Sequence, residues 1–218
     1  MIYAIIFCAA APNLPPQRSF MEREKDNKKL LIYALIFLFS LILFSGVYGI
    51  GMLNPTNADY VYSTWDTEQH YFGWVAYRNS DWHFPLGLHD GLTYPDLTSV
   101  IFTDSIPLFA FLGKLLSPLL PETFQYFGIY ALLCLFLTGT ITAHMLFEFS
   151  EDKLFITTAA FLSMIIPAVF IRSFMHEALA AQFLLFFTLE TMFLFFKNKD
   201  LRSCLIRCAL SGFLAGGT

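Results

Sequence analysis

The densest polar chemistry of this chain lies in the stretch from Trp65 to Trp74, whose sequence is WDTEQHYFGW. Asp66, Glu68 and His70 stand at alternate positions in this stretch, and Gln69 adds an amide. Carboxylate and imidazole groups transfer protons, and together they can bind a divalent cation such as Mg²⁺ or Mn²⁺. If the chain carries out chemistry, we expect that chemistry here.

The same stretch contains the signal for a helix. Asp66 and Gln69 have the spacing of a capping box, which predicts a helix with Asp66 as its N-cap. We expect this helix to run to about Arg78 and to stop at Asn79 and Ser80. Its aromatic residues suit a helix that lies at the level of the lipid headgroups. These residues are Tyr71, Phe72, Trp74 and Tyr77.

The helix prediction bears directly on metal binding. On a helix, Asp66 and His70 share a face while Glu68 points elsewhere. On an extended segment all three side chains would align. The helix therefore disfavours a Mg²⁺ or Mn²⁺ site formed by these three residues but leaves it open, with solvated charges as the alternative.

The composition indicates an integral membrane protein. Hydrophobic residues make up 56% of the chain, charged residues make up 14%, and the mean hydropathy is +0.59. An ordinary soluble domain has about 25% charged residues. The sequence contains no Walker loop, no dinucleotide fingerprint and no Cys/His zinc spacing, and we expect no nucleic-acid partner. We therefore predict an all-α polytopic protein whose main partner is the lipid bilayer.

The distribution of charge predicts the topology. Basic residues precede a first apolar run at 30–53, which places the N-terminus in the cytoplasm. The following segment, 54–105, contains seven acidic residues and a single strong base, Arg78, as is typical of an exported loop. The apolar segment 106–120 is too short to cross and contains Lys114, which we expect to reach the headgroups.

These patterns divide the chain into a series of segments. They are a cytoplasmic segment at 1–29 (with 1–20 interpreted as an upstream extension), a transmembrane helix at 30–53, an exported loop with interfacial helices at 54–105, an interfacial or re-entrant helix at 106–120, transmembrane helices at 124–147, 154–171 and 178–196, and the start of a further, truncated helix at 203–218. We therefore expect about four complete spans and a partial fifth. Such a chain has the form of an N-terminal portion of a longer protein.

Three stretches resemble a known group of proteins. The sequences WDTEQHYFGWVAYRNSDWHFPLG, FTDSIPL and LSPLLPETFQYFG are similar to a bacterial family of uncharacterised multi-pass membrane proteins usually grouped with the GT-C glycosyltransferases. The resemblance covers about Asp66 to Gln182. It implies a GT-C-like fold in the bacterial cytoplasmic membrane. It also implies transfer of a sugar from a polyprenyl-phosphate donor to an envelope glycan or lipid acceptor.

The resemblance also implies roles for individual residues. Asp66 matches the loop carboxylate that takes a proton from the acceptor hydroxyl, with helix capping alone as the alternative. Glu68, Gln69 and His70 would contact substrate beside it, and a divalent metal, if bound, would offset the phosphate charge of the donor.

Two further polar positions lie at or inside the predicted spans. Arg172, His176 and Glu177 lie at the mouth of two spans, and the first two, four positions apart, could contact a lipid phosphate or simply reach the interface. After Asp66, the alternative positions for the base are Glu68 and then Glu177. Glu190 lies well inside the span 178–196, and we expect it to contact another helix through His144 or Gln182 rather than to transport protons. The alternative functions are a transporter or flippase, and an inactive fragment.

Overall fold

The computed structural model of this chain describes residues 20–59 and 65–218. Its elements are, in chain order, α2 (Phe20–Tyr48), η1 (Ile50–Leu53), α3 (Trp65–Asn79), β1 (Leu88–His89), β2 (Thr98–Ser99), η3 (Val100–Thr103), α4 (Pro107–Leu115), η4 (Ser117–Leu119), α5 (Phe127–Leu146), α6 (Lys153–Met164), α7 (Pro167–Arg172), η5 (Glu177–Ala180), α8 (Phe183–Asn198) and α9 (Leu201–Gly217). The interpretation of residues 1–20 as an extension falls, except for Phe20, outside this range and stays a prediction.

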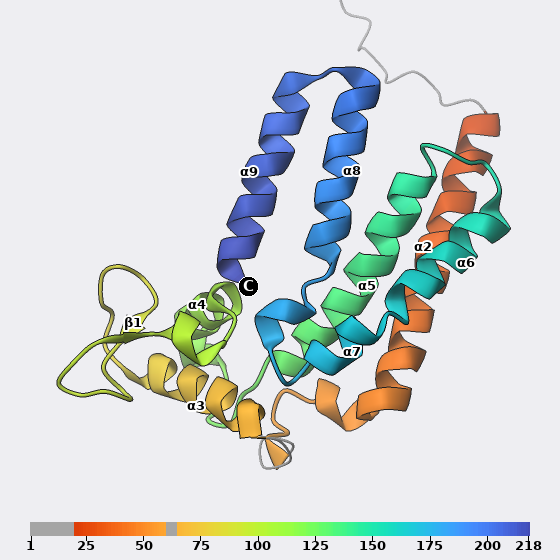
Figure 1. Ribbon diagram of the computed structural model, residues 1–218. Coiled ribbons are helices and arrows are strands. Elements are labelled where there is room, and N and C mark those ends of the chain that lie inside the picture. The colour runs from red at the N-terminus through yellow and green to blue at the C-terminus, as the bar shows by residue number, and fades with distance from the viewer. Residues whose placement is uncertain (1–19, 60–64) are drawn as a thin grey trace, which may run out of the picture.

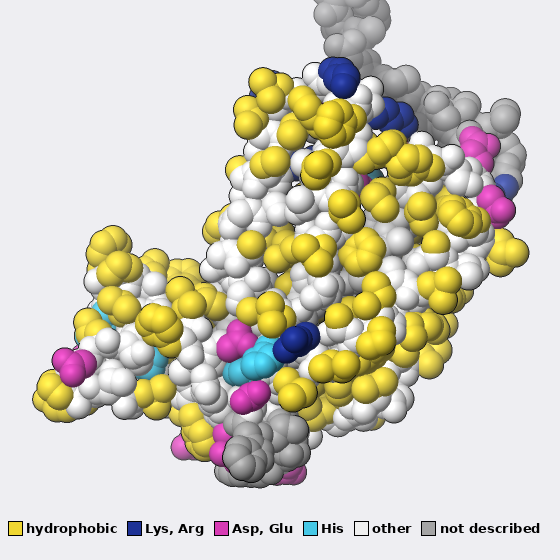
Figure 2. Space-filling model, in the orientation of Figure 1, with side chains coloured by type: hydrophobic (Ala, Val, Ile, Leu, Met, Phe, Trp, Pro, Cys, Tyr) yellow, Lys and Arg dark blue, Asp and Glu magenta, His cyan; other side chains and the backbone are white. Residues whose placement is uncertain are grey.

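Three helical segments have the properties of membrane spans. Asp26–Tyr48, Phe127–Leu146 and Lys153–Arg172 are long and apolar enough to cross a membrane, judged by length and composition. Helices α2, α5 and α6 pack side by side in one bundle (Figure 1). Hydrophobic side chains cover much of the visible surface of the bundle (Figure 2), as contact with lipid requires. The structure is thus mostly helical, as the sequence predicts.

The predicted span at 154–171 consists of two helices. α6 ends at Met164, and α7 begins at Pro167. Proline has no backbone N–H and its ring clashes with the preceding turn, so it favours the first position of a new helix over the interior of an old one.

The predicted fourth span is shorter than expected. α8 begins at Phe183 rather than Ala178 and has 16 residues, whereas a span needs about 20. The preceding chain is irregular because Phe174 adopts a left-handed conformation (φ 66°) and the 3-10 turn η5 follows. α9 has 17 residues, so it is more than the half-span that the sequence suggests. α8 and α9 pack together as a hairpin, and α9 returns to α4 (Figure 1).

Residues 65–126 form a lobe beside one end of the bundle (Figure 1). The helix predicted in this region is confirmed, since α3 spans Trp65–Asn79 and so starts two residues before and ends one residue after the predicted helix. Asp66 lies in the first turn of α3, so it is not the predicted N-cap. Beyond α3, the strands β1 and β2 pair antiparallel, with Leu88 opposite Ser99.

The interior of the lobe differs from the expected interfacial helix. Trp74 and Tyr77 are fully buried, and the Trp74 ring Nε1 donates to the Phe124 carbonyl at 2.8 Å. Lys114 is also buried, so the expectation that it reaches headgroups is wrong. Its ammonium donates to Asp81 O at 3.0 Å and lies 4.3 Å from the centre of the Tyr77 ring. The short helix α4 packs on α3, and this contact encloses side chains that a lone interfacial helix would expose.

The lobe is fixed to the bundle at the start of α5. The Gln125 amide nitrogen donates to the carbonyls of Met52 and Asn54, each at 2.9 Å. A Cβ at Gly128 would lie 1.9 Å from the Met52 oxygen, so only glycine permits this approach. The position of the lobe relative to α2 and α5 is therefore set by specific contacts.

Accessible cysteines can test the topology. In a protein without its native cysteines, we expect an impermeant thiol reagent applied to intact cells to label Asn79→Cys and Met175→Cys but not Asn198→Cys. Each of these positions is exposed, whereas Ser173 in the same turn as Met175 is buried and unsuitable. Labelling of Asn198→Cys without Met175→Cys would contradict the predicted orientation.

Candidate functional site

One face of α3 binds two segments that are distant in sequence. Thr67 is buried, and its hydroxyl donates to the Phe174 carbonyl at 2.8 Å. A Cβ at Gly73 would lie 2.0 Å from the Thr103 hydroxyl oxygen, so α3 approaches the η3 turn without room for a side chain. Helix α3 therefore joins the end of η3 to the chain that follows α7.

His70 makes the central polar contacts at this junction. The side chain is buried, with Nδ1 at 2.9 Å from the Thr103 carbonyl and Nε2 at 3.2 Å from the Met175 carbonyl. Both partners are acceptors, and only a doubly protonated imidazolium can donate to both. His70 therefore bridges the two segments through its two ring nitrogens.

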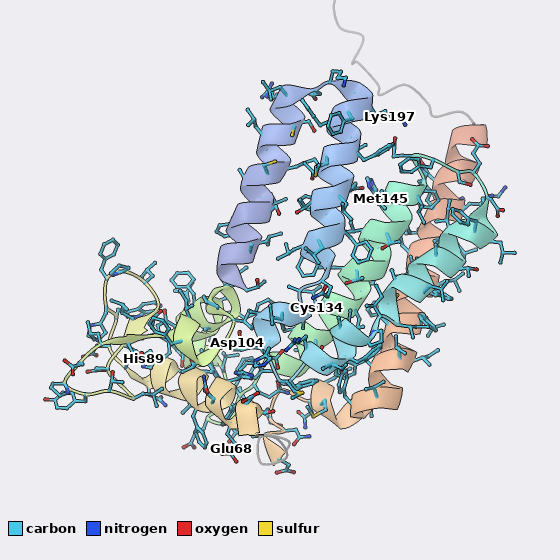
Figure 3. All side chains as sticks on the ribbon, viewed as in Figure 1. Glu68, His89, Asp104, Cys134, Met145 and Lys197 are labelled. Atoms are coloured by element: carbon cyan, nitrogen blue, oxygen red, sulfur yellow. The ribbon has the colours of Figure 1, made fainter. Side chains whose placement is uncertain are left out.

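Asp104 lies between these segments at the end of η3. Its backbone is left-handed (φ 52°), a conformation that Asp tolerates better than most residues. One carboxylate oxygen accepts the Ala178 N–H at 3.0 Å. Burial raises the pKa of Asp104, and this effect is opposed by the Ala178 amide and by the nearby charges of His70 and His176. Figure 3 shows Asp104 between α3 and the turn after α7.

Glu177 is the second acid of this junction. It is fully buried, and within the described residues neither carboxylate oxygen has a hydrogen-bond partner of good geometry. Burial raises the pKa of Glu177 well above its usual value, and the charge of Asp104 raises it further. The amide of Phe174 opposes this increase only in part. We call Asp104 and Glu177 the acid pair.

The acid pair can hold a proton to a higher pH than ordinary carboxyl groups do. Two carboxyl groups that interact in a dry site do not ionise independently, so one of them keeps its proton to an unusually high pH. Such perturbed groups are characteristic of sites that transfer protons. Asp104 is only half-buried, so it is the member of the pair that solvent or a substrate can reach.

The acid pair predicts how stability depends on pH. A raised pKa means that the folded state keeps the Glu177 proton at a pH where the unfolded state has lost it, so stability falls as pH rises through that interval. We expect Glu177→Gln to flatten this fall. The measurement is the thermal unfolding midpoint in detergent from about pH 5 to about pH 9. If the buried glutamine amide destabilises the protein equally at every pH, it shifts the whole curve of unfolding midpoint against pH and leaves the slope of that curve unchanged.

Glu122→Gln, at an exposed position, is the control for this prediction. Parallel curves for Glu177→Gln and wild type would contradict it.

The predicted site residues divide between the interior and the surface. Asp66 and Glu68 are half-buried in the first turn of α3. Glu68 lies on the side of α3 away from Asp104 in Figure 3. The Gln69 side chain donates to the Phe102 carbonyl at 3.0 Å. His70 is the member of the predicted set that reaches the acid pair.

The structure does not form the metal site considered for Asp66, Glu68 and His70. Both ring nitrogens of His70 contact backbone carbonyls. In the part of the chain that the structure describes, no group of three His, Cys, Asp or Glu side chains is placed to hold a metal ion. The physical reason is the helix itself, which separates Glu68 from the face that carries Asp66 and His70.

Arg172 and His176 lie at the edge of the same junction. Arg172 ends α7, and its carbonyl accepts the N–H of His176 at 2.8 Å in the turn that leads to Glu177. The His176 side chain is exposed, and its charge acts on Asp104. Acidic, histidine and basic side chains gather in one patch on this face of the molecule (Figure 2). An anionic group could therefore meet cations next to the acid pair.

Comparison with known proteins assigns the chain to a family. A family model described as a domain of unknown function, DUF6311, matches residues 37–217. The chain belongs to the DUF6311 family. No curated protein and no solved structure matches it. The resemblance to an uncharacterised family is thus confirmed, and the DUF6311 match contains α3, the acid pair and every predicted site residue.

The DUF6311 region contains a second polar cluster between α5, α8 and α9. Glu190 is buried, and its two carboxylate oxygens contact His144 Nδ1 and Arg207 Nη2. Arg207 Nε also donates to the Thr191 hydroxyl at 3.0 Å. The predicted contact with His144 is confirmed, whereas the Gln182 amide donates to the Leu179 carbonyl. Three helices of this DUF6311 chain are therefore joined by one buried carboxylate.

Sequence reasoning missed two of the residues in these clusters. Asp104 was counted only among the loop acids, although it stands in the stretch FTDSIPL that carries part of the family resemblance. Arg207 stands alone among apolar residues in α9, and an isolated charge in such a run is the signal that could have identified it.

Proposed function

We propose that this protein is an integral-membrane, GT-C-like glycosyltransferase that moves a sugar from a polyprenyl-phosphate donor to an envelope glycan or lipid acceptor. The single observation that carries the proposal is the acid pair. It combines a reachable carboxylate of raised pKa with a fully buried partner, next to histidines and at the end of a set of candidate membrane spans. The resemblance to GT-C enzymes supplies the reaction class.

In this proposal Asp104 accepts the proton. The acceptor hydroxyl oxygen attacks the anomeric carbon of the sugar, and its proton passes to the Asp104 carboxylate. The bond from the anomeric carbon to the phosphate oxygen breaks, and polyprenyl phosphate leaves with the electron pair. Burial raises the pKa of Asp104, and a carboxylate of raised pKa is a stronger base, which supports Asp104 in this role.

The neighbouring cations would act on the phosphate. Arg172 ends α7, and His176 follows in the turn that leads to Glu177, where its charge acts on Asp104. In the proposal, both pair with the phosphate that gains charge as the sugar departs. The charge of His70 would keep Asp104 available as a carboxylate. Asp66, half-buried at the start of α3, remains the competing position for the base.

A transport function is the second candidate. It is favoured by the buried contacts among His144, Glu190 and Arg207 and by the irregular chain between α7 and α8. The two functions give different products, because transfer makes a new glycosidic bond and transport leaves the lipid-linked sugar chemically unchanged.

The experiment uses the full-length protein in liposomes with radiolabelled polyprenyl-phosphate hexoses and pentoses. The proposal predicts that label moves into an envelope lipid or glycan acceptor with release of polyprenyl phosphate. Movement of intact donor across the bilayer without a new product would favour transport. If the protein neither transfers sugar from any of these donors nor moves any of them across the bilayer, the assignment to this donor class is refuted.

A further inference from the structure

A cationic cavity lies at the other end of the bundle from the acid pair. It has a volume of about 200 Å³ and is lined by Lys28, Lys29, Phe147, Ser150, Glu151 and Lys153. These residues come from α2, from the turn between α5 and α6, and from the first residue of α6. Lys and Arg side chains gather toward this end of the molecule in Figure 2. The cavity belongs to neither polar cluster described above.

The chemistry of the cavity suits an anion with several oxygens. Its lining includes three lysines and one glutamate. The Lys29 nitrogen lies 5.1 Å from the centre of the ring of Phe147, which also lines the cavity, so the two side chains make a cation–π contact. The Ser150 hydroxyl accepts the Asp152 N–H at 3.0 Å, which leaves its own proton for a ligand. A phosphate group takes hydrogen bonds and charge from such donors.

The start of α6 is already capped, so the side chains define this site. Asp152 accepts the N–H groups of Leu154 and Phe155 at 2.9 and 3.2 Å. These N–H groups of α6 are already taken, so the binding of an anion in the cavity depends on the side chains of the lysines and Ser150.

Apolar surface begins directly beside the lysines. Leu30 and Leu31 follow Lys29 in α2 and are 68% and 60% exposed. Leu154 and Phe155 follow Lys153 in α6 and are 77% and 52% exposed. The candidate spans that contain these residues begin at Asp26 and Lys153, so the cavity lies at the depth of lipid headgroups.

We propose that this cavity binds the phosphate of an anionic lipid whose acyl chains lie along α2 and α6. The cations and Ser150 recognise the headgroup, and the exposed leucines and Phe155 contact the chains. A soluble phosphate would contact only the cations and Ser150 and would leave the exposed leucines and Phe155 uncovered. The phosphate of a lipid is therefore the favoured ligand. The site is independent of sugar transfer.

The experiment is native mass spectrometry of the purified full-length protein mixed with phosphatidylglycerol or with phosphatidylcholine of the same acyl chains. We expect retention of phosphatidylglycerol over phosphatidylcholine. Lys29→Gln and Lys153→Gln should each weaken this retention by about fivefold, the expected effect of one basic residue near an anionic lipid surface. Both lysines are exposed, so the variants should fold, and circular dichroism checks this.

Lys199→Gln is the matched control. Lys199 lies in the turn between α8 and α9, at the same end of the molecule but outside the cavity, and its substitution removes the same charge (Figure 1). If Lys199→Gln lost phosphatidylglycerol retention equally, the lipid would be attracted by the basic end of the molecule in general, and the proposal of a specific site in the cavity would be overturned. Equal retention of phosphatidylcholine would also overturn it. Displacement of phosphatidylglycerol by inorganic phosphate at comparable concentration would replace the lipid with a soluble phosphate as the ligand.

Discussion

Asp104→Asn is expected to lower sugar transfer by at least about a hundredfold while the protein inserts and accumulates normally, since proton transfer of this kind contributes about 10²–10⁴-fold to rate. Asparagine cannot accept the proton as a carboxylate does. It can keep the oxygen that accepts the Ala178 N–H, and it adopts the left-handed backbone of this position as readily as aspartate. The variant therefore removes the base with little change to the fold.

Two further substitutions separate the possible bases. Asp66→Asn should have a smaller effect than Asp104→Asn if the base is Asp104, and Asp96→Asn, at an exposed position of the lobe, should be nearly silent. The measurement is the rate of transfer by full-length variants with a polyprenyl-phosphate donor that the wild type uses. Near-normal transfer by Asp104→Asn together with a large loss in Asp66→Asn would move the base to the position that the sequence first suggested.

Glu190→Leu is expected to lower the free energy of unfolding by up to about 3–5 kcal/mol, because it leaves a half-buried charge without its carboxylate partner. The charge in question is Arg207, whose guanidinium contacts Glu190 between α8 and α9. His144 is affected less because its side chain is 54% exposed and can reach other partners. The measurement is unfolding in detergent micelles followed by circular dichroism.

The controls for this prediction use the same chain. Lys197→Leu breaks the exposed pair with Glu148 and should cost less than about 1 kcal/mol. The double variant Glu190→Leu/Arg207→Leu should recover most of the loss, because an apolar pair in place of a buried ion pair is close to neutral. A Glu190→Leu variant as stable as Lys197→Leu would show that the buried contacts contribute little.

The sequence alone predicted the elements whose signals are local. The polar break at Asn79 predicted the end of α3 to within one residue, the capping spacing placed its start two residues late, and hydropathy predicted the helices of the bundle. The single acid of α8 was matched correctly with His144, because few polar partners exist in such apolar helices. Each of these signals lies within one helix or follows from the scarcity of polar residues.

Only the tertiary structure decided how distant segments meet. Asp104 and Ala178 are 74 positions apart, and no periodicity in either segment indicates that the acid pair forms. The burial of Lys114 depends on how α4 packs over α3, and the Arg207 contact depends on the turn between α8 and α9. Burial and charge pairing act across space between residues far apart in sequence, so local patterns predict the helices of this protein, and packing decides which of their acids share a site.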